Sequence, residues 1–164
     1  MTLDGDLDIG SVYGASLTIT NGLTLNGTAT SGGSGQPYNS MKFRGSQTLD
    51  GAGTVIFGNS YNPTMILSLG GTTLTIGPGI TIHGGTSVNG LPAYIGRNYN
   101  SGTPYNVTLI NQGTIQADVS GAAITVDCQS FTNYGNVQAL NGSTLNSTVP
   151  SAKSSSTGII RASV

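Results

Sequence analysis

Apolar and polar residues alternate along short stretches throughout the chain, and turn-forming residues separate these stretches. Leu17-Thr18-Ile19-Thr20 and Thr54-Val55-Ile56-Phe57 are examples, and Leu23-Thr24-Leu25 has Asn-Gly on both sides. A period of two places successive side chains on opposite faces, which is typical of a β-strand. Asn-Gly, Gly-Gly and Gly-Pro-Gly tolerate positive φ and therefore favour tight turns. The pattern predicts many short strands joined at frequent corners.

A repeat indicates how these strands are arranged. The segment LINQGTIQA, residues 109–117, corresponds to FTNYGNVQA, residues 131–139, at an offset of 22 residues. Such an offset is typical of one coil of a parallel β-helix, in which equivalent residues stack at the strand spacing of ~4.8 Å. We therefore expect a structural ladder at one corner, in which Asn111 lies over Asn133 and the turn is made by Gly113 and Gly135.

Looser copies extend the repeat towards the N-terminus. With Gly53, Gly79, Gly113 and Gly135 as markers, the successive separations are 26, 34 and 22 residues. Unequal coils place their extra residues in loops on one side of the rod. The prediction is one all-β domain over residues 1–164, a single-stranded parallel β-helix (β-solenoid) of about six or seven coils. We expect loop inserts near 31–40, 59–64 and 85–106, a flexible segment over 147–158, and a last strand after it.

Composition and charge exclude several classes of protein. The chain has 26 Gly, 7% charged residues and no Glu, so a helical fold is close to excluded. Five scattered Lys and Arg residues cannot line a phosphate track, so no nucleic-acid partner is expected. No apolar stretch is long enough for membrane insertion. The single cysteine, Cys128, permits no internal disulfide and is expected to be a small buried residue.

Groups capable of chemistry are few. Asp4, Asp6 and Asp8 have the spacing that opens a calcium loop, but Ile9 and Ala15 occupy the positions that need Gly and Glu. We expect an outward-facing stripe on a first strand instead and assign no metal site, and weak calcium binding is the alternative. His83 precedes Gly-Gly and is expected to be a solvated turn residue. No catalytic residue and no cofactor is predicted, because no triad-like grouping is present.

The less regular inserts carry most of the tyrosines, each beside an Asn. A Tyr ring offers a flat apolar face with a polar tip, and Asn offers paired donors and acceptors, which suits sugar hydroxyls or a protein partner. The alternative is that these rings only cover the side of the rod. The candidate ligand-binding residues are Tyr38, Tyr61, Tyr99, Asn100 and Tyr105.

Three phrases carry a family resemblance: LTITNGLTLNG at 17–27, GTTLTIGPGITI at 71–82 and INQGTI at 110–115. They resemble the repeat regions of very large bacterial surface and secreted proteins of the filamentous-haemagglutinin and autotransporter-passenger kind. The resemblance implies a right-handed parallel β-helix, extracellular or on the cell surface, that acts as a stalk, adhesin or matrix component. The Tyr-Asn inserts lie outside that general pattern, so it assigns no binding residue.

The function expected from these observations is a non-catalytic structural or adhesive module of an exported bacterial protein. Open β-helix ends present unpaired backbone groups, so self-association with further repeats or copies is expected, together with a possible glycan or cell-surface partner. One alternative is a carbohydrate-binding module that uses the Tyr- and Asn-bearing loops. A less favoured alternative is a polysaccharide-cleaving enzyme, which needs at least two Asp beside Arg97 or His83 in a groove.

Overall fold

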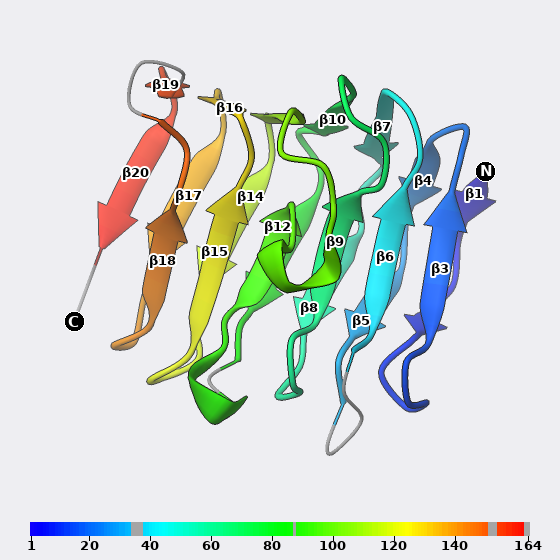
Figure 1. The fold of residues 1–164 in the computed structure, drawn as a ribbon, viewed down its shortest axis with the longest axis horizontal. Helices are drawn as coiled ribbons and strands as arrows, with labels where there is room; N and C mark the ends of the chain where they lie inside the picture. The colour runs from blue at the N-terminus through cyan, green and yellow to red at the C-terminus, as the bar shows by residue number, and fades with distance from the viewer. Residues whose placement is uncertain (34–37, 87, 151–153, 163–164) are drawn as a thin grey trace.

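The computed structural model describes residues 1–33, 38–86, 88–150 and 154–162. The strands of this part of the chain form three parallel sheets, which we call A, B and C (Figure 1). Sheet A contains, in spatial order, β1 (Thr2–Leu3), β4 (Leu23–Leu25), β7 (Gln47–Asp50), β10 (Thr73–Ile76), β13 (Thr108–Asn111), β16 (Ser130–Asn133) and β19 (Ser154–Ser156). Sheet B contains β2 (Leu7–Asp8), β5 (Thr28–Ser31), β8 (Thr54–Phe57), β11 (Thr81–Gly84), β14 (Thr114–Ala117), β17 (Asn136–Ala139) and β20 (Ile159–Ala162). Sheet C contains β3 (Ser16–Ile19), β6 (Ser40–Phe43), β9 (Thr64–Leu67), β12 (Ala93–Gly96), β15 (Ala123–Asp127) and β18 (Thr144–Ser147).

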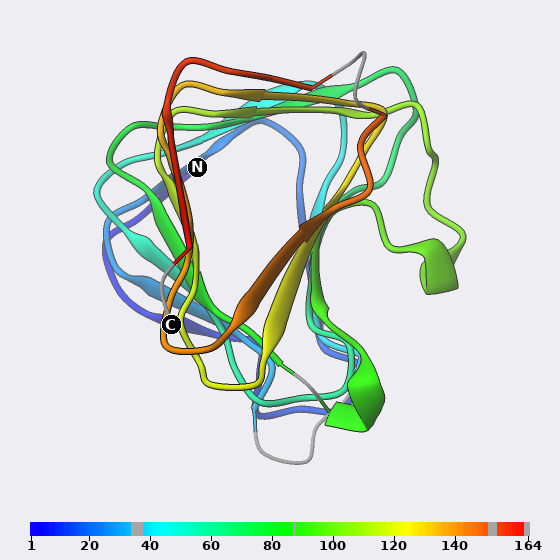
Figure 2. The ribbon, with the colours of Figure 1, turned by 90° about the vertical axis from the view of Figure 1, so that its left-hand side faces the viewer.

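The chain enters sheets A, B and C in turn, and each strand pairs in parallel with the strand three places later. This order makes a β-solenoid of about six coils, as the sequence predicts. Figure 2 looks along the rod: the path runs anticlockwise from A through B to C as it approaches the viewer, which is a right-handed coil. Two 3-10 turns, η1 (Val88–Gly90) and η2 (Tyr99–Ser101), interrupt the loops. No helix among the described residues is long and apolar enough to cross a membrane.

Columns of apolar side chains fill the interior. In sheet B, Val55, Ile82, Ile115 and Val137 lie in one register column, and each is at most 5% exposed. The alternate positions point outward, where Thr28, Thr54, Thr81 and Thr114 form a second column. The alternation in the sequence therefore separates an inner and an outer face on each strand, because successive side chains point to opposite sides.

The register confirms the 22-residue offset. Asn111 lies opposite Asn133 and Ile115 lies opposite Val137. The sequence alignment that made Gly79 the equivalent of Gly53 is wrong by one residue. Thr81 pairs with both Thr54 and Thr114, so Ile80 is the equivalent of Gly53. The two coil lengths there are therefore 27 and 33 residues. Gly79 instead packs against the preceding corner, since a Cβ at Gly79 would lie 2.2 Å from the Gly51 carbonyl oxygen.

The loops leave the rod at two corners, whereas the sequence predicts one side. Extra residues join β5 to β6, β8 to β9 and β11 to β12 at the corner between sheets B and C. The expected insert 85–106 is two loops, because strand β12 divides it, and its second half lies at the corner between C and A. The expected flexible segment 147–158 contains strand β19, paired with β16, while residues 151–153 lie outside the described part. The last strand, β20, is where it was expected.

Candidate functional site

The outer face of sheet C is partly covered, unlike an ordinary solenoid face. Thr64, Ile66 and Thr125 are at most 4% exposed, although the first two alternate with inward-facing Met65 and Leu67. Loops at both ends of the sheet project beyond it (Figure 2), and η2 lies in front of β9 and β12 in Figure 1. The long corner connections thus make two walls, and sheet C is the floor between them.

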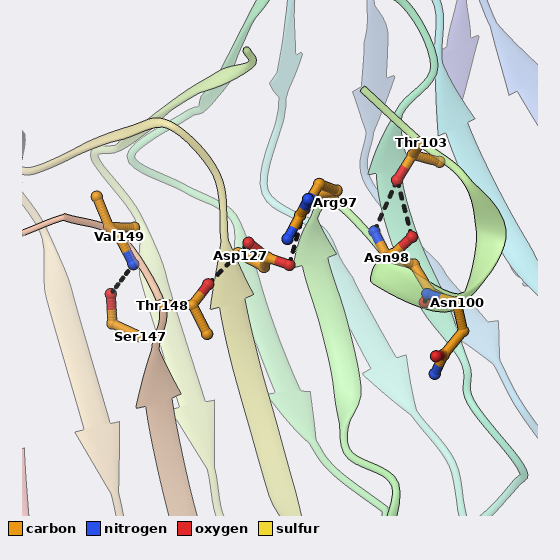
Figure 3. Close-up of polar contacts among 8 residues, drawn as sticks. All are labelled: Arg97, Asn98, Asn100, Thr103, Asp127, Ser147, Thr148 and Val149. Carbon is orange, nitrogen blue, oxygen red and sulfur yellow. Dashed lines mark hydrogen bonds and ion pairs between the residues drawn. The ribbon is translucent and has the colours of Figure 1, made fainter. Parts of the chain in front are cut away.

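The wall at the corner between C and A is an ordered turn (Figure 3). Asn98 begins η2, and its side-chain Oδ1 accepts a hydrogen bond from the Asn100 backbone N–H at 2.9 Å. The Thr103 hydroxyl accepts from the Asn98 backbone N–H at 2.9 Å and donates to the Asn98 carbonyl at 3.0 Å. Gly102 ends the turn with a φ of 63°, in the left-handed region that suits glycine. The loop is therefore closed on itself by its own polar groups.

Arg97 fastens this loop to sheet C. Its Nε donates to Asp127 Oδ2 at 3.0 Å, and the Thr148 hydroxyl donates to Asp127 Oδ1 at 2.7 Å (Figure 3). The guanidinium carbon lies 4.8 Å from the ring centroid of Tyr105 and 5.6 Å from that of Tyr99, within cation–π range. Asp127 is only 3% exposed, so the pair also neutralises a buried carboxylate.

The tyrosines gather in two clusters instead of one. At the corner between B and C, the ring centroids of Tyr13 and Tyr38 are 6.0 Å apart and those of Tyr38 and Tyr61 are 5.2 Å apart, both edge to face. The Tyr38 N–H also donates to the Tyr61 carbonyl at 3.0 Å. Tyr99 and Tyr105 lie around Arg97 at the other corner. The structure thus brings the candidates together in pairs, and the exposed Asn100 sits in the turn with Tyr99.

A groove of about 350 Å³ runs between these walls. Its floor is formed by outward residues of β6 and β9, among them Lys42, Thr64 and Ile66. Tyr38 and Asn62 lie on one side, and residues 101–104 with Asn98 lie on the other. A second hollow of about 550 Å³ follows on the same face over β12, β15 and β18, lined by Tyr94, Tyr99 and Asp127 among others. Burial, with a smaller contribution from Asp127, raises the pKa of Tyr94.

The Asn ladder lies inside the rod, away from the groove. Asn111 Nδ2 donates to Asn133 Oδ1 at 2.7 Å, and Asn133 Nδ2 donates to the Ser156 hydroxyl at 3.1 Å. Each amide also donates to the carbonyl of the glycine two residues later, at 3.3 Å. Glycine is required at this corner because a Cβ at Gly135 would lie 2.0 Å from the Gly113 carbonyl oxygen. The ladder therefore links successive coils through fully buried amides.

The remaining titratable groups are dispersed. The sequence predicted a turn position for His83, but His83 lies in strand β11. Its Nδ1 is 3.2 Å from Asp118 Oδ2. In the described residues His83 and Arg97 thus have one carboxylate each, on different sheets, so the paired Asp that a polysaccharide-cleaving site needs is not assembled around either. Burial raises the pKa of the Cys128 thiol to about 12, and Cys128 is fully buried as the sequence predicts.

The N-terminal aspartates do not form the single stripe expected. Asp4 and Asp6 lie at the corner between β1 and β2, where they accept from Asn26 Nδ2 at 2.7 Å and from the Thr28 N–H at 2.9 Å. Asp8 ends β2 and accepts from Gly10 and Ser11. Within the described ranges, no three His, Cys, Asp or Glu side chains are grouped so as to hold a metal ion.

Of the residues that line the groove, only Tyr38 was among the sequence candidates, and Lys42, Asn62 and Asn98 were missed. Asn62 and Asn98 belong to the Tyr-bearing inserts, so the Tyr-Asn signal contained them, whereas Lys42 is identifiable only as an outward strand position. No protein-family model, curated protein or solved structure matches the chain. Its function is therefore inferred from the geometry of the rod and of its lateral face.

Proposed function

We propose that the chain is a non-catalytic structural and adhesive module of an extracellular bacterial protein, and that it stacks end to end with further coils or copies. The observation that carries the proposal is the exposed inward face of the last described coil. Ile160 continues the inward column of Val137, yet Ile160 is 68% exposed and Val137 only 5%. Among the described residues, an inward apolar position that is exposed in the last coil favours contact with a further coil, of the same chain or of another copy.

The register also supports a head-to-tail arrangement. Sheet B begins with β2 and ends with β20, and in its columns Leu7 is equivalent to Ile160 and Asp8 to Arg161. If the next copy continues the coil, its Leu7 covers Ile160 and its Asp8 lies beside Arg161. Opposite charges on neighbouring strands are favourable, and a contact of this head-to-tail kind does not close into a ring when the subunits continue along one axis.

Placement outside a bacterial cell is supported by the resemblance of segments 17–27, 71–82 and 110–115 to the repeat regions of exported bacterial proteins. The low content of charged residues, 7%, agrees with the stacking of coils, because like charges on successive coils repel at the ~4.8 Å strand spacing. In this function the coils provide length and stiffness, and the lateral loops provide the variable surface.

Sedimentation velocity over a range of concentrations, with electron microscopy of the same samples, tests the stacking. We expect rods that lengthen in units of one chain. Ile160→Asp weakens association at least tenfold, because it places a charge on the apolar end. Val119→Asp is the matched control, since Val119 is also exposed but lies in the turn between β14 and β15 on the side of the rod.

A charge exchange tests the register. Arg161→Glu weakens stacking of copies, and Asp8→Arg in the same chain restores it. Monomers at every concentration, or side-by-side association that Ile160→Asp leaves unchanged, contradict the proposal.

A further inference from the structure

Two asparagines that line the groove over β6 and β9 each have a buried amide atom without a hydrogen-bond partner. In the part of the chain that the structure describes, Asn62 Oδ1 and Asn98 Nδ2 are buried and unpaired. Asn62 is 4% exposed and Asn98 is 1% exposed, and both line the groove, from opposite walls. A buried polar group without a partner is unfavourable, so native proteins rarely retain one without a reason. One atom is an acceptor and the other a donor, and a ligand hydroxyl provides both functions.

Backbone strain coincides with the same place. Only three non-glycine residues of the described chain have positive φ, and two of them, Tyr38 with 66° and Asn62 with 62°, line the groove. Asn tolerates this conformation but Tyr adopts it rarely. Tyr38 is 50% exposed, so its ring has a free part at the rim although it contacts Tyr13 and Tyr61. An aromatic ring held at the edge of a polar groove is suited to pack against the apolar face of a sugar.

The charge of the groove selects among sugars. Lys42 is on the floor, in register with Ile66 on β9, and no Asp is among the described lining residues. The ion pairs of the described chain are those of His83 with Asp118 and of Arg97 with Asp127, so Lys42 has no carboxylate partner there. An ammonium group with no protein counter-charge favours an anionic ligand, and its hydrogen bonds to a carboxylate are charge-assisted.

We propose that this groove binds an oligosaccharide that carries carboxylate groups. Sugar hydroxyls meet Asn62 and Asn98, one sugar ring lies against Tyr38, and a carboxylate pairs with Lys42. The site differs from the one that the sequence predicted. Only Tyr38, one of the five candidate tyrosine and asparagine residues, belongs to it. It is also independent of end-to-end stacking, since it lies on the side of the rod.

Isothermal titration calorimetry with two probes of equal length, an oligouronate and an uncharged oligoglucoside, tests the proposal. We expect the oligouronate to bind at least tenfold more tightly, and its affinity to fall as salt is raised. Lys42→Gln removes this preference, and Tyr38→Ala weakens oligouronate binding about tenfold. Because Tyr38 also contacts two other rings, each variant is checked for the wild-type melting temperature.

Ser101 offers a test that does not disturb the fold, since it is exposed and lies on the wall of the groove. Ser101→Glu weakens oligouronate binding several-fold, and Ser101→Lys strengthens it. The same two substitutions at Ser120, which is exposed in a turn outside the groove, are matched controls and leave the affinity unchanged. Equal affinity for the two probes, no binding of either, or equal effects at Ser101 and Ser120 overturn the proposal. Stacking is measured separately by sedimentation, so failure of one proposal is distinguishable from failure of the other.

Discussion

The two halves of the rod use different chemistry at one equivalent position. One inward column of sheet A is occupied by Leu23, Leu49 and Ile76 in the second to fourth coils, and by Asn111 and Asn133 in the fifth and sixth. All five side chains are at most 2% exposed. The first half of the column is held by apolar burial, and the second by amides that bond to one another and to the corner carbonyls.

The difference shows that the coil fixes where an inward side chain lies but accepts either an apolar side chain or an amide there. An Asn is stable in this interior only when its donors and acceptor are met, and a stack of equivalent residues is one means of meeting them. At the boundary between the two halves, the hydrogen-bonding groups of the ladder are incompletely paired. Asn111 Oδ1 is buried without a partner, because the residue above it in the preceding coil is Ile76, which has no donor. The comparison can therefore be tested at the boundary and away from it.

The largest effect is expected from an amide in the apolar half. Leu49→Asn removes a fully buried Leu and leaves an amide between Leu23 and Ile76, neither of which can bond to it. The lost burial and the unpaired polar group together lower the free energy of unfolding by about 4 kcal/mol. Urea unfolding followed by circular dichroism measures this. A loss below about 1 kcal/mol would show that the two halves are interchangeable.

A smaller effect is expected from the same amide at the boundary. Ile76→Asn also loses apolar burial, but its Nδ2 can donate to the unpaired Asn111 Oδ1 and so lengthen the ladder by one residue. We expect its destabilisation to be smaller than that of Leu49→Asn by about 1–3 kcal/mol, the usual penalty of an unsatisfied buried group. The two variants are matched, since they occupy the same column in successive coils. Equal destabilisation would contradict the ladder as the cause.

The smallest effect concerns pH and only the C-terminal half, which contains Cys128. In the unfolded chain the thiol ionises near 9.0, whereas burial raises the pKa of the folded thiol to about 12. Between these values the unfolded state binds fewer protons, so stability falls as pH rises above about 9. From pH 8 to pH 10 this group contributes a loss of about 1 kcal/mol. Between pH 8 and pH 10 the free energy of unfolding of Cys128→Ala should fall by that much less than that of the wild type, as measured by urea unfolding. An equal fall in both proteins would contradict burial of the thiol.

The sequence predicted the coil but not the path of its loops. The copies at 109–117 and 131–139 are paired as their similarity predicts, because the coil between them has short corners and no long insertion. At Gly79 the same reasoning was wrong by one residue. Two glycines can each be required by backbone contact at a corner without being equivalent, and Gly79 packs against Gly51 while Ile80 is equivalent to Gly53.

The candidate site was predicted in part. The Tyr-Asn inserts were recognised as the variable surface, and Tyr38 lies in the groove. The length of an insert does not say which corner it leaves, so the separation of Tyr38 and Tyr61 from Tyr99 and Tyr105 was not predictable. Lys42 has no motif around it, and it joins the site only because β6 and β9 are neighbours beneath the loop that Arg97 fastens.

By itself the sequence determined the strand type, the alternation of inner and outer faces, the length of the shortest coil and the Asn–Gly corner of its last coils. These features follow from contacts between residues near in sequence, or at one repeated offset, where backbone preference and burial act alike in every coil. The tertiary structure alone decided which corner each insert leaves and which polar atoms remain unpaired on sheet C. Asn62 and Asn98 lie 36 positions apart in unlike loops. They line one groove because β9 and β12 pair in parallel, so that the loop before β9 and the loop after β12 lie at opposite ends of neighbouring strands.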